Sequence, residues 1–312
     1  MPVLAPGLAW VDLKFRGSPN VIATAVVSDA GGVALIDPGP ASCLDALELG
    51  LNGMGIRFTD VTHILLTHVH LDHAGVTGTL VRRYPALSVF VHERGTPHLI
   101  DPTRLIKSAT RLWGNQMQML WGEVAPVPVA NITTLTLPGG RVLSGPPNRI
   151  DAAGRTFDVA YTPGHASHHI SFFDPSSGVA FVGDAAGIRI TGDYVRLPTP
   201  PPDIDVELWT ETAARIERWN PATMFLTHFG PSGNVRVHLQ SLVENLHASA
   251  EWVRQSLLEP GSDDEKARRY ADFIDRDMRR HLSEADILPH RVGAPFEVSW
   301  LGLARYWRKK GL

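Results

Sequence analysis

One heptapeptide constrains this chain more than any other feature: Thr67-His68-Val69-His70-Leu71-Asp72-His73. It contains three imidazoles and one carboxylate, which are side chains that bind metal ions. The apolar stretch 61–66 directly before it predicts a short buried strand, which would hold the following loop in place. Because side chains alternate along an extended segment, His68 and His70 are expected to face the same side. Burying such a polar group without a metal ion would be unfavourable, so the heptapeptide predicts a metal site.

Three single residues farther along the chain repeat this arrangement of a ligand-type side chain after a strand. They are His165 after the strand predicted at 157–162, Asp184 after 179–183, and His228 after 224–227. Each alone would be weak evidence, since a polar residue often follows an apolar strand. Together with the heptapeptide, they indicate that four strand ends meet and offer enough ligands for two metal ions. A mixed set of imidazoles and carboxylates suits zinc, iron or manganese.

The hydrophobic pattern up to about residue 234 predicts strands and helices along the chain. Short apolar runs bounded by turns predict the strands, and apolar residues spaced by three and four predict the helices. The main predicted strands are 21–27, 33–36, 61–66, 87–92, 157–162, 169–173, 179–183 and 224–227. The predicted helices are 44–51, 76–84, 105–121 and 208–219. Such a pattern is typical of an α/β protein with helices outside a sheet core.

The hydrophobic pattern of the sequence changes near residue 235. Beyond that point the amphipathic runs 235–258, 263–281 and 296–310 predict helices only. We therefore divide the chain into a main domain, 1–234, and an all-helical C-terminal extension, 235–312. The extension is expected to wall a small-molecule pocket or to form the contact of a homodimer.

The order of the candidate ligands resembles that of the metallo-β-lactamase superfamily over roughly residues 20–230, close to its glyoxalase II-like hydrolase branch. The resemblance implies an αββα sandwich, in which two sheets pack together, helices lie outside, and the metals sit at one edge. It also implies two metal ions. The first would be held by His68, His70 and His165, the second by Asp72, His73 and His228, and Asp184 would bridge both.

The resemblance and the local pattern assign supporting roles to a few other residues. Asp37 ends an early predicted strand and matches a family position that supports the motif loop. His169 begins a strand near His165 and is a second candidate for orienting a ligand. Asp72 is expected to act in catalysis as well, by accepting a hydrogen bond from the attacking hydroxide and moving its proton. Tyr194 and Trp113 are the candidates for substrate contacts.

Composition narrows the classes of partner. The net charge of −3 and pI near 6.5 offer no basic field for nucleic acid. No apolar stretch approaches the ~20 residues of a membrane span, and the N-terminus does not read as a signal peptide, so a cytoplasmic enzyme is expected. The single cysteine, Cys43, excludes a disulfide framework and a structural zinc site with several cysteines. The expected partner is a small-molecule substrate.

Two activities remain open at this stage. The first is a binuclear hydrolase, with zinc as the first choice and iron or manganese as alternatives. The second is a mononuclear iron oxidoreductase of the persulfide dioxygenase type, whose iron is held by two histidines and an aspartate. The complete second ligand set favours the hydrolase. The proline-rich segment 198–203 departs from the glyoxalase II pattern, so thioesters, lactones, β-lactams and phosphoesters all remain candidate substrates.

Overall fold

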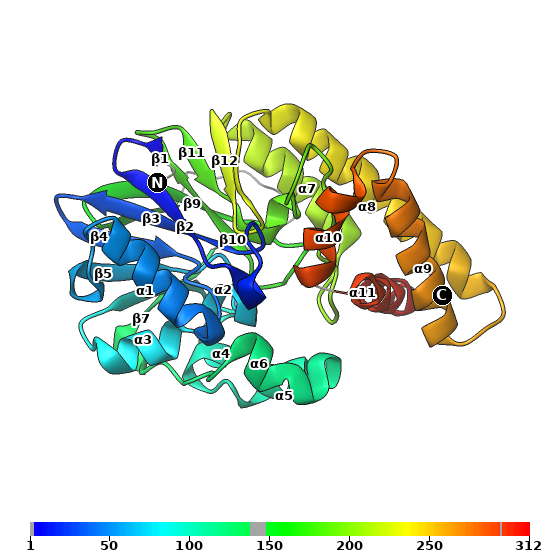
Figure 1. Cartoon of the computed structure of the whole chain (residues 1–312), viewed down its shortest axis with the longest axis horizontal. Helices are drawn as coiled ribbons and strands as arrows, with labels where there is room; N and C mark the ends of the chain where they lie inside the picture. Colours follow the sequence, from blue (N-terminus) through cyan, green and yellow to red (C-terminus); the bar gives the residue numbers. More distant parts are fainter. Residues whose placement is uncertain (1–2, 138–147, 294) are drawn as a thin grey trace.

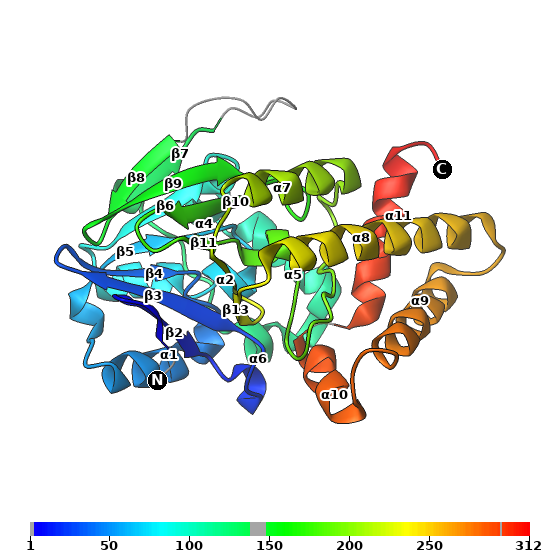
Figure 2. The same ribbon diagram turned by 90° about the horizontal axis from the view of Figure 1, so that it is seen from above.

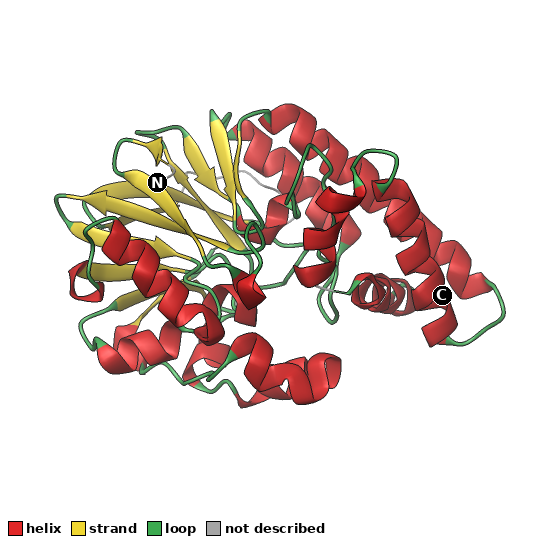
Figure 3. Ribbon diagram, viewed as in Figure 1, coloured by secondary structure: helices red, strands yellow, loops and turns green. Residues whose placement is uncertain are grey.

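Two β-sheets packed face to face form the centre of the molecule, with helices on their outer sides (Figures 1 and 3). The computed structural model describes residues 3–137, 148–293 and 295–312. Side chains from both sheets meet in one buried cluster, in which Ala25 and Leu65 of the first sheet pack with Phe157 and Phe172 of the second. The αββα sandwich expected from the sequence is therefore present.

The first sheet follows the order of the chain within the described residues. Its strands are β1 (Val3–Ala5), β2 (Leu8–Asp12), β3 (Ala23–Asp29), β4 (Gly32–Ile36), β5 (Val61–Leu65), β6 (Ser88–His92) and β7 (Ile132–Leu135). Strands β1 to β4 pair in antiparallel fashion, and β4 to β7 pair in parallel. The carboxyl ends of β4 and β5 consequently lie at the same edge of the sheet.

The second sheet is mostly antiparallel. In spatial order its described strands are β13 (Gly230–Ser232), β12 (Thr223–Leu226), β11 (Val179–Phe181), β10 (Ile170–Asp174), β9 (Arg155–Tyr161) and β8 (Asn148–Ala152). Only β11 and β12 are parallel neighbours in this set. Their carboxyl ends, which precede Asp184 and His228, are therefore adjacent.

Apolar side chains on both faces explain why the strands read as continuous hydrophobic runs. In β4, Ala34 and Ile36 face the layer between the sheets, whereas Val33 and Leu35 join the outer cluster. The helices that supply the rest of this outer cluster include α1 (Leu44–Gly53) and α3 (Thr77–Arg83). On the other side, α7 (Val206–Arg218) covers the second sheet through Trp209, Ala213 and Ile216.

The helix expected at 105–121 is wrong as a single element. The chain forms α5 (Thr103–Trp113), a short 3-10 turn at 114–116 and α6 (Met117–Trp121). Gly114 has a positive φ of 52°, which ends α5, and this backbone conformation favours glycine. The short helices α2 (Leu71–Ala74) and α4 (Thr96–Ile100) complete this half of the molecule.

The C-terminal helices share a core with the second half of the sandwich. They are α8 (Val235–Leu258), α9 (Asp263–Met278), α10 (Glu284–Gly293) and α11 (Phe296–Lys309), of which α10 was not predicted. Figure 2 shows α8 running away from the sheets toward α9 and α11. Trp209 of α7, Leu242 of α8 and Trp300 of α11 belong to one buried cluster. The change at residue 235 is thus one of secondary structure, and the apolar core continues across it.

Within the described part of the chain, no helix has the length and apolar character needed to cross a membrane.

Candidate metal centre

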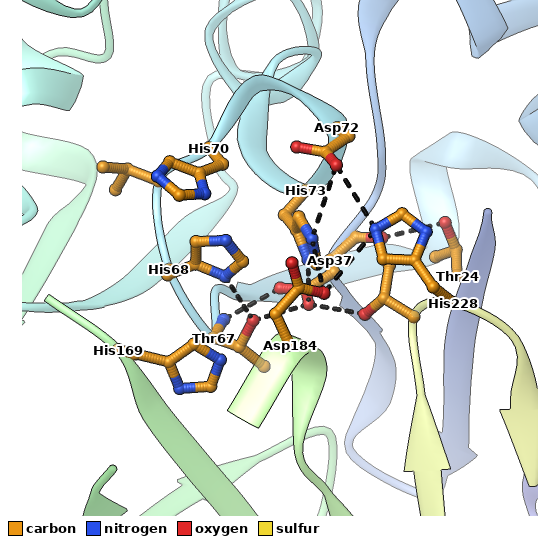
Figure 4. A network of polar contacts seen from close by, with 12 residues as sticks. Thr24, Asp37, Thr67, His68, His70, Asp72, His73, His169, Asp184 and His228 are labelled. Carbon is orange, nitrogen blue, oxygen red and sulfur yellow. Dashed lines mark hydrogen bonds and ion pairs between the residues drawn. The ribbon is translucent and has the colours of Figure 1, made fainter. Parts of the chain in front are cut away.

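The seven expected ligands converge where several strands end. Figure 4 labels six of them, all except His165. The heptapeptide leaves β5 and enters α2, while the other three residues follow β9, β11 and β12. Three overlapping groups have ligand atoms within 4.8 Å of one another. They are His68, His70 and His165; His68, His73 and Asp184; and Asp72, His73 and His228.

Asp184 connects these groups through its two carboxylate oxygens. Its Oδ2 lies 3.4 Å from His165 Nε2, while its Oδ1 lies 3.3 Å from His73 Nε2 and 3.6 Å from His228 Nε2. Asp72 Oδ2 approaches the same His228 nitrogen at 3.3 Å. Asp184 therefore lies between the two sets of histidines, with one carboxylate oxygen facing each set, and the bridging role that the resemblance implies stays a prediction.

Two of the histidines, His165 and His228, are held in orientation by backbone carbonyl groups. The Nδ1 atoms of His165 and His228 each lie 2.7 Å from a backbone carbonyl, of Pro198 and Val21 respectively. A carbonyl oxygen only accepts, so each Nδ1 carries the proton and donates it. In a neutral ring this leaves the Nε2 lone pair directed into the site, which is the form that binds a metal ion.

Several buried atoms in the site have no hydrogen-bond partner among the described residues. They are His68 Nε2 and the two atoms His73 Nε2 and Asp184 Oδ1, which lie 3.3 Å apart as an ion pair without forming a hydrogen bond. In addition, His70 Nδ1 and His165 Nε2 lie only 3.0 Å apart. Because the proton of His165 is already on Nδ1, its Nε2 presents a lone pair to the His70 ring. Unsatisfied buried nitrogens and carboxylate oxygens are rare without a reason, and a bound cation would satisfy this set. The residues present thus fit divalent metal ions.

A buried carboxylate, that of Asp37, holds the motif loop against the second sheet. Its Oδ1 accepts from Thr67 N at 2.8 Å, and its Oδ2 accepts from Thr67 Oγ1 at 2.7 Å and Thr227 Oγ1 at 2.8 Å. The same Oδ2 lies 2.8 Å from His73 Nδ1. Asp37 is 0% exposed. The prediction that it contacts the ligand loop agrees with these contacts, which connect residues on both sheets.

A glycine allows the two strand ends to approach so closely. Gly183 has a φ of 47°, and a Cβ there would lie 2.4 Å from Thr67 Oγ1 and 3.0 Å from His169 Nε2. Any larger residue would push Asp184 away from the motif loop. The His169 ring stacks on His68 with centroids 4.9 Å apart, and its Nδ1 lies 3.0 Å from Thr162 Oγ1. His169 therefore contacts the ligand ring by stacking, and no hydrogen bond joins it to a ligand among the described residues.

The electrostatics differ between the two sides of the site. Burial, together with the neighbouring imidazoles, holds the pKa of His68 well below its ordinary value. Burial acts in the same direction on the pKa of His73, but the carboxylates of Asp184, Asp37 and Asp72 outweigh it and raise that pKa well above the ordinary value. Burial would raise the pKa of Asp184, yet His73, His228 and His165 lower it strongly. The His68 side is thus a cluster of neutral imidazoles, while the His73 side is rich in carboxylates.

The site opens into a cavity of about 230 Å³. His70, Asp72, His165, Asp184 and His228 form part of its lining. The rest comes largely from α5 and α6, from the segment 198–203, and from Val298 and Ser299 of α11. Part of the helical extension therefore walls the cavity, as expected.

The two predicted substrate contacts have different positions. Trp113 lines the cavity, whereas Tyr194 does not. The Tyr194 hydroxyl donates to Asp277 Oδ2 of α9 at 3.0 Å, and its ring packs near His281. The prediction for Tyr194 is corrected on this ground, because its hydroxyl is engaged with the helical extension. The spacing of ten positions from Asp184 to Tyr194 gave no information on the direction of the Tyr194 side chain.

Sequence reasoning missed the two threonines that donate to Asp37. Thr67 and Thr227 each directly precede a candidate ligand, in Thr67-His68 and Thr227-His228. This repeated Thr-His pair at two strand ends was a signal that could have identified them. His168 was also left without a role, although it lines the cavity and its Nδ1 lies 3.4 Å from Val69 N.

A two-sheet sandwich with histidines and aspartates gathered at its strand ends defines a metal-binding class of α/β protein. The chain belongs to the metallo-beta-lactamase superfamily, whose family model matches residues 18–228.

Curated relatives agree with this assignment at low identity. The chain is 30% identical over 172 residues to the metallo-beta-lactamase fold-containing protein ST1585 of Sulfurisphaera tokodaii, which is 54% of this chain and 60% of that protein. It is 25% identical over 169 residues to a hydroxyacylglutathione hydrolase of Legionella pneumophila strain Lens, covering 54% of this chain and 48% of the relative. The matches thus span between 48% and 60% of the length of these two relatives.

Solved structures show the same fold. The metallo-beta-lactamase family protein TTHA1429 from Thermus thermophilus superposes with a TM-score of 0.68 and 24% identity, covering 99% of this chain and 95% of that one. The archaeal superfamily protein ST1585 from Sulfolobus tokodaii gives a TM-score of 0.61 and 21% identity, covering 95% and 98%. The high coverage of both chains means that these likenesses include the C-terminal helices.

Proposed function

We propose that this chain is a binuclear metal-dependent hydrolase that cleaves an ester-like bond of a small molecule. The observation that carries the proposal is the position of Asp184, whose two oxygens face His165 on one side and His73 and His228 on the other. A carboxylate placed between two sets of histidines suits a pair of cations better than a single one. Zinc is the first candidate because imidazole-rich sets suit it, and iron or manganese are the alternatives.

The proposed ligands fall into two sets that share Asp184. His68, His70 and His165 would hold one cation, Asp72, His73 and His228 would hold the other, and Asp184 would contact both. When bound, such cations supply Lewis acidity, which polarises a carbonyl or phosphoryl oxygen and makes water a stronger acid.

Asp72 is the residue proposed to handle the proton. Its side chain is 25% exposed and lines the cavity, whereas that of Asp184 is 3% exposed. Burial acts to raise the pKa of Asp72, but His73 and His228 lower it to about 2. A carboxylate that is ionised at neutral pH and open to the cavity can accept a proton from the attacking water and deliver it to the leaving group.

The buried carbonyl and carboxylate partners keep the histidines in a fixed orientation. Val21 O and Pro198 O hold His228 and His165, and Asp37 holds His73. Preorganisation of this kind lowers the free energy needed to arrange the ligands during reaction. Several relatives are named hydroxyacylglutathione hydrolases, and their low identity to this chain leaves the bond that it cleaves as a proposal.

The test is hydrolysis of a panel of substrates by purified protein of known metal content. The panel contains a thioester, a lactone, a phosphodiester and a β-lactam. We expect turnover of at least one class, loss of that turnover on chelation, and recovery when zinc is restored. Oxygen consumption with a persulfide by protein that holds a single iron ion, without hydrolysis of any panel member, would reject the proposal in favour of the oxidoreductase.

A further inference from the structure

The cavity that contains the metal centre has walls that the proposed chemistry does not need. Leu105, Ala109, Leu112 and Trp113 of α5 and Trp121 of α6 line it. We propose that these walls bind the apolar acyl chain of an ester or thioester substrate, whose carbonyl lies at the metal centre. The inference rests on the hydrolase function proposed above and specifies its substrate class.

The first observation is that α5 is amphipathic but lacks a fully buried residue. Leu105, Ala109 and Trp113 pack against the first outer core, yet each is only partly covered. An apolar helix face normally gains its stability by complete burial against the protein. Here the same face is a wall of the cavity, so an apolar ligand would remove further apolar surface from water.

The second observation is that the tryptophans of this wall pack against a buried ring of the core. The rings of Trp113 and Trp121 meet edge to face with centroids 5.5 Å apart. Trp121 stacks in turn on Phe15 at 5.7 Å, and Phe15 is 1% exposed. A wall anchored in the core keeps its shape when a ligand binds, which limits the entropy lost on binding.

The third observation is that other segments add apolar side chains to the cavity wall. Ile188, Ile190 and Val298 line the cavity, together with the prolines of the segment 198–202. Proline has a fixed φ and a side chain without polar atoms, so this segment is a stiff apolar wall. Elements from distant parts of the chain thus present apolar surface to one space that ends at the metal centre.

We expect the cationic side chains in the lining to contribute less to ligand affinity than the apolar walls do. Arg94, Arg104 and Arg196 also line the cavity. The first two are exposed to solvent, whereas Arg196 is buried and its guanidinium lies 5.2 Å from the centre of the Phe296 ring. Solvent screening makes ion pairs with exposed groups weak. We therefore expect chain length to decide affinity more than charge does.

The experiment measures binding of straight-chain alkyl thioethers, in which a methylene replaces the thioester carbonyl, to the zinc-loaded full chain by calorimetry. Affinity should rise about fourfold for each added methylene group until the cavity is filled. Affinity that is independent of chain length would overturn the proposal.

Two matched variants of α5 locate the binding surface. Ala109→Trp adds bulk inside the cavity and should lower the affinity for long thioethers by at least about tenfold, which is roughly the contribution of two buried methylene groups. Lys107→Trp adds a similar bulk to the exposed face of the same helix and should leave the affinity unchanged. Equal effects of both variants would also overturn the proposal.

If Ala109→Trp does not fold, Leu112→Ala removes apolar surface from the same wall, and it should weaken binding of long thioethers. Because a thioether is not hydrolysed, the two proposals fail separately. Chain-length dependence without any hydrolysis would reject the hydrolase and retain the acyl-chain site. Hydrolysis of short esters without chain-length dependence would reject the acyl-chain site alone.

Discussion

The carboxylate of Asp37 lies 2.8 Å from His73 Nδ1, although the two residues are 36 positions apart in the chain. Both side chains are almost completely buried, at 1% and 0% exposure. The contact joins the end of β4 to the motif loop that follows β5. It places the other nitrogen of His73, Nε2, toward Asp184 and Asp72.

Asp37→Ala should therefore weaken both metal binding and folding. The change leaves the Thr67, Thr227 and His73 donors buried without an acceptor, which is expected to lower the free energy of unfolding by about 3–5 kcal/mol. Loss of such a supporting contact typically lowers metal affinity about 10–100-fold. Denaturant unfolding and competition with a chelator measure the two effects. Asp45→Ala, an exposed position on α1, is the control, and a metal affinity equal to that of the control would contradict the role of Asp37.

Asp72→Asn separates proton transfer from metal retention. The amide keeps the shape of the side chain but cannot hold the proton, so turnover should fall about 10²–10⁴-fold. We expect most of this loss to remain when the metal content is matched to that of the unmodified protein by adding zinc. Elemental analysis beside steady-state kinetics gives the comparison, with Asp264→Asn on the exposed start of α9 as the control. Activity that recovers in full with metal content would limit Asp72 to a ligand role.

His228→Ala should remove one of two metal equivalents. The variant loses a nitrogen that faces both Asp72 and Asp184, while His68, His70 and His165 are untouched. Titration with zinc, followed by calorimetry, should give two equivalents for the unmodified chain and one tight equivalent for the variant. His247→Ala, at an exposed histidine on α8, should keep two. A stoichiometry of one in the unmodified chain would be incompatible with a binuclear centre.

His238 should make folding sensitive to acid, independently of the metal centre. Its ring is 4% exposed, its Nε2 donates to Ala186 O at 2.7 Å, and burial lowers its pKa to about 4. The unfolded chain binds this proton near pH 6.5, so the unfolded state gains protons first as the pH falls. Above pH ~6.5 the contribution of His238 to the free energy of unfolding is present in full. As the pH falls from ~6.5 to ~4, the free energy of unfolding decreases by about 3 kcal/mol because of this one group.

Comparison with His238→Gln isolates this contribution, because the metal ligands titrate equally in both proteins. Glutamine can donate to Ala186 O and accept from Ser232 without taking up a proton. Unfolding in denaturant at several pH values between ~7 and ~4 should show a shallower pH dependence for the variant. Parallel curves for the two proteins would show that His238 does not titrate in this range.

Much of the fold was readable from local patterns. Strands such as Val61–Leu65 and helices such as Val235–Leu258 were predicted to within a residue or two, because their apolar spacing is long and regular. Interruptions of helices were harder to predict. Gly114 interrupts the predicted helix 105–121, and α10 was overlooked because Pro289 lies inside it. Very short strands such as β13, with the sequence Gly-Pro-Ser, carry almost no periodic signal.

The amino-acid sequence alone determined which seven side chains form the candidate centre, because metal chemistry needs particular residue types and a strand-end position is visible in the pattern. Only the tertiary structure decided what surrounds them. It turned Tyr194 toward Asp277, brought Thr67 and Thr227 to one oxygen of Asp37, and made α5 and the proline segment parts of the wall of one cavity. The reason is physical: residue type and periodicity are local properties, whereas the direction of a side chain depends on how distant segments pack around it.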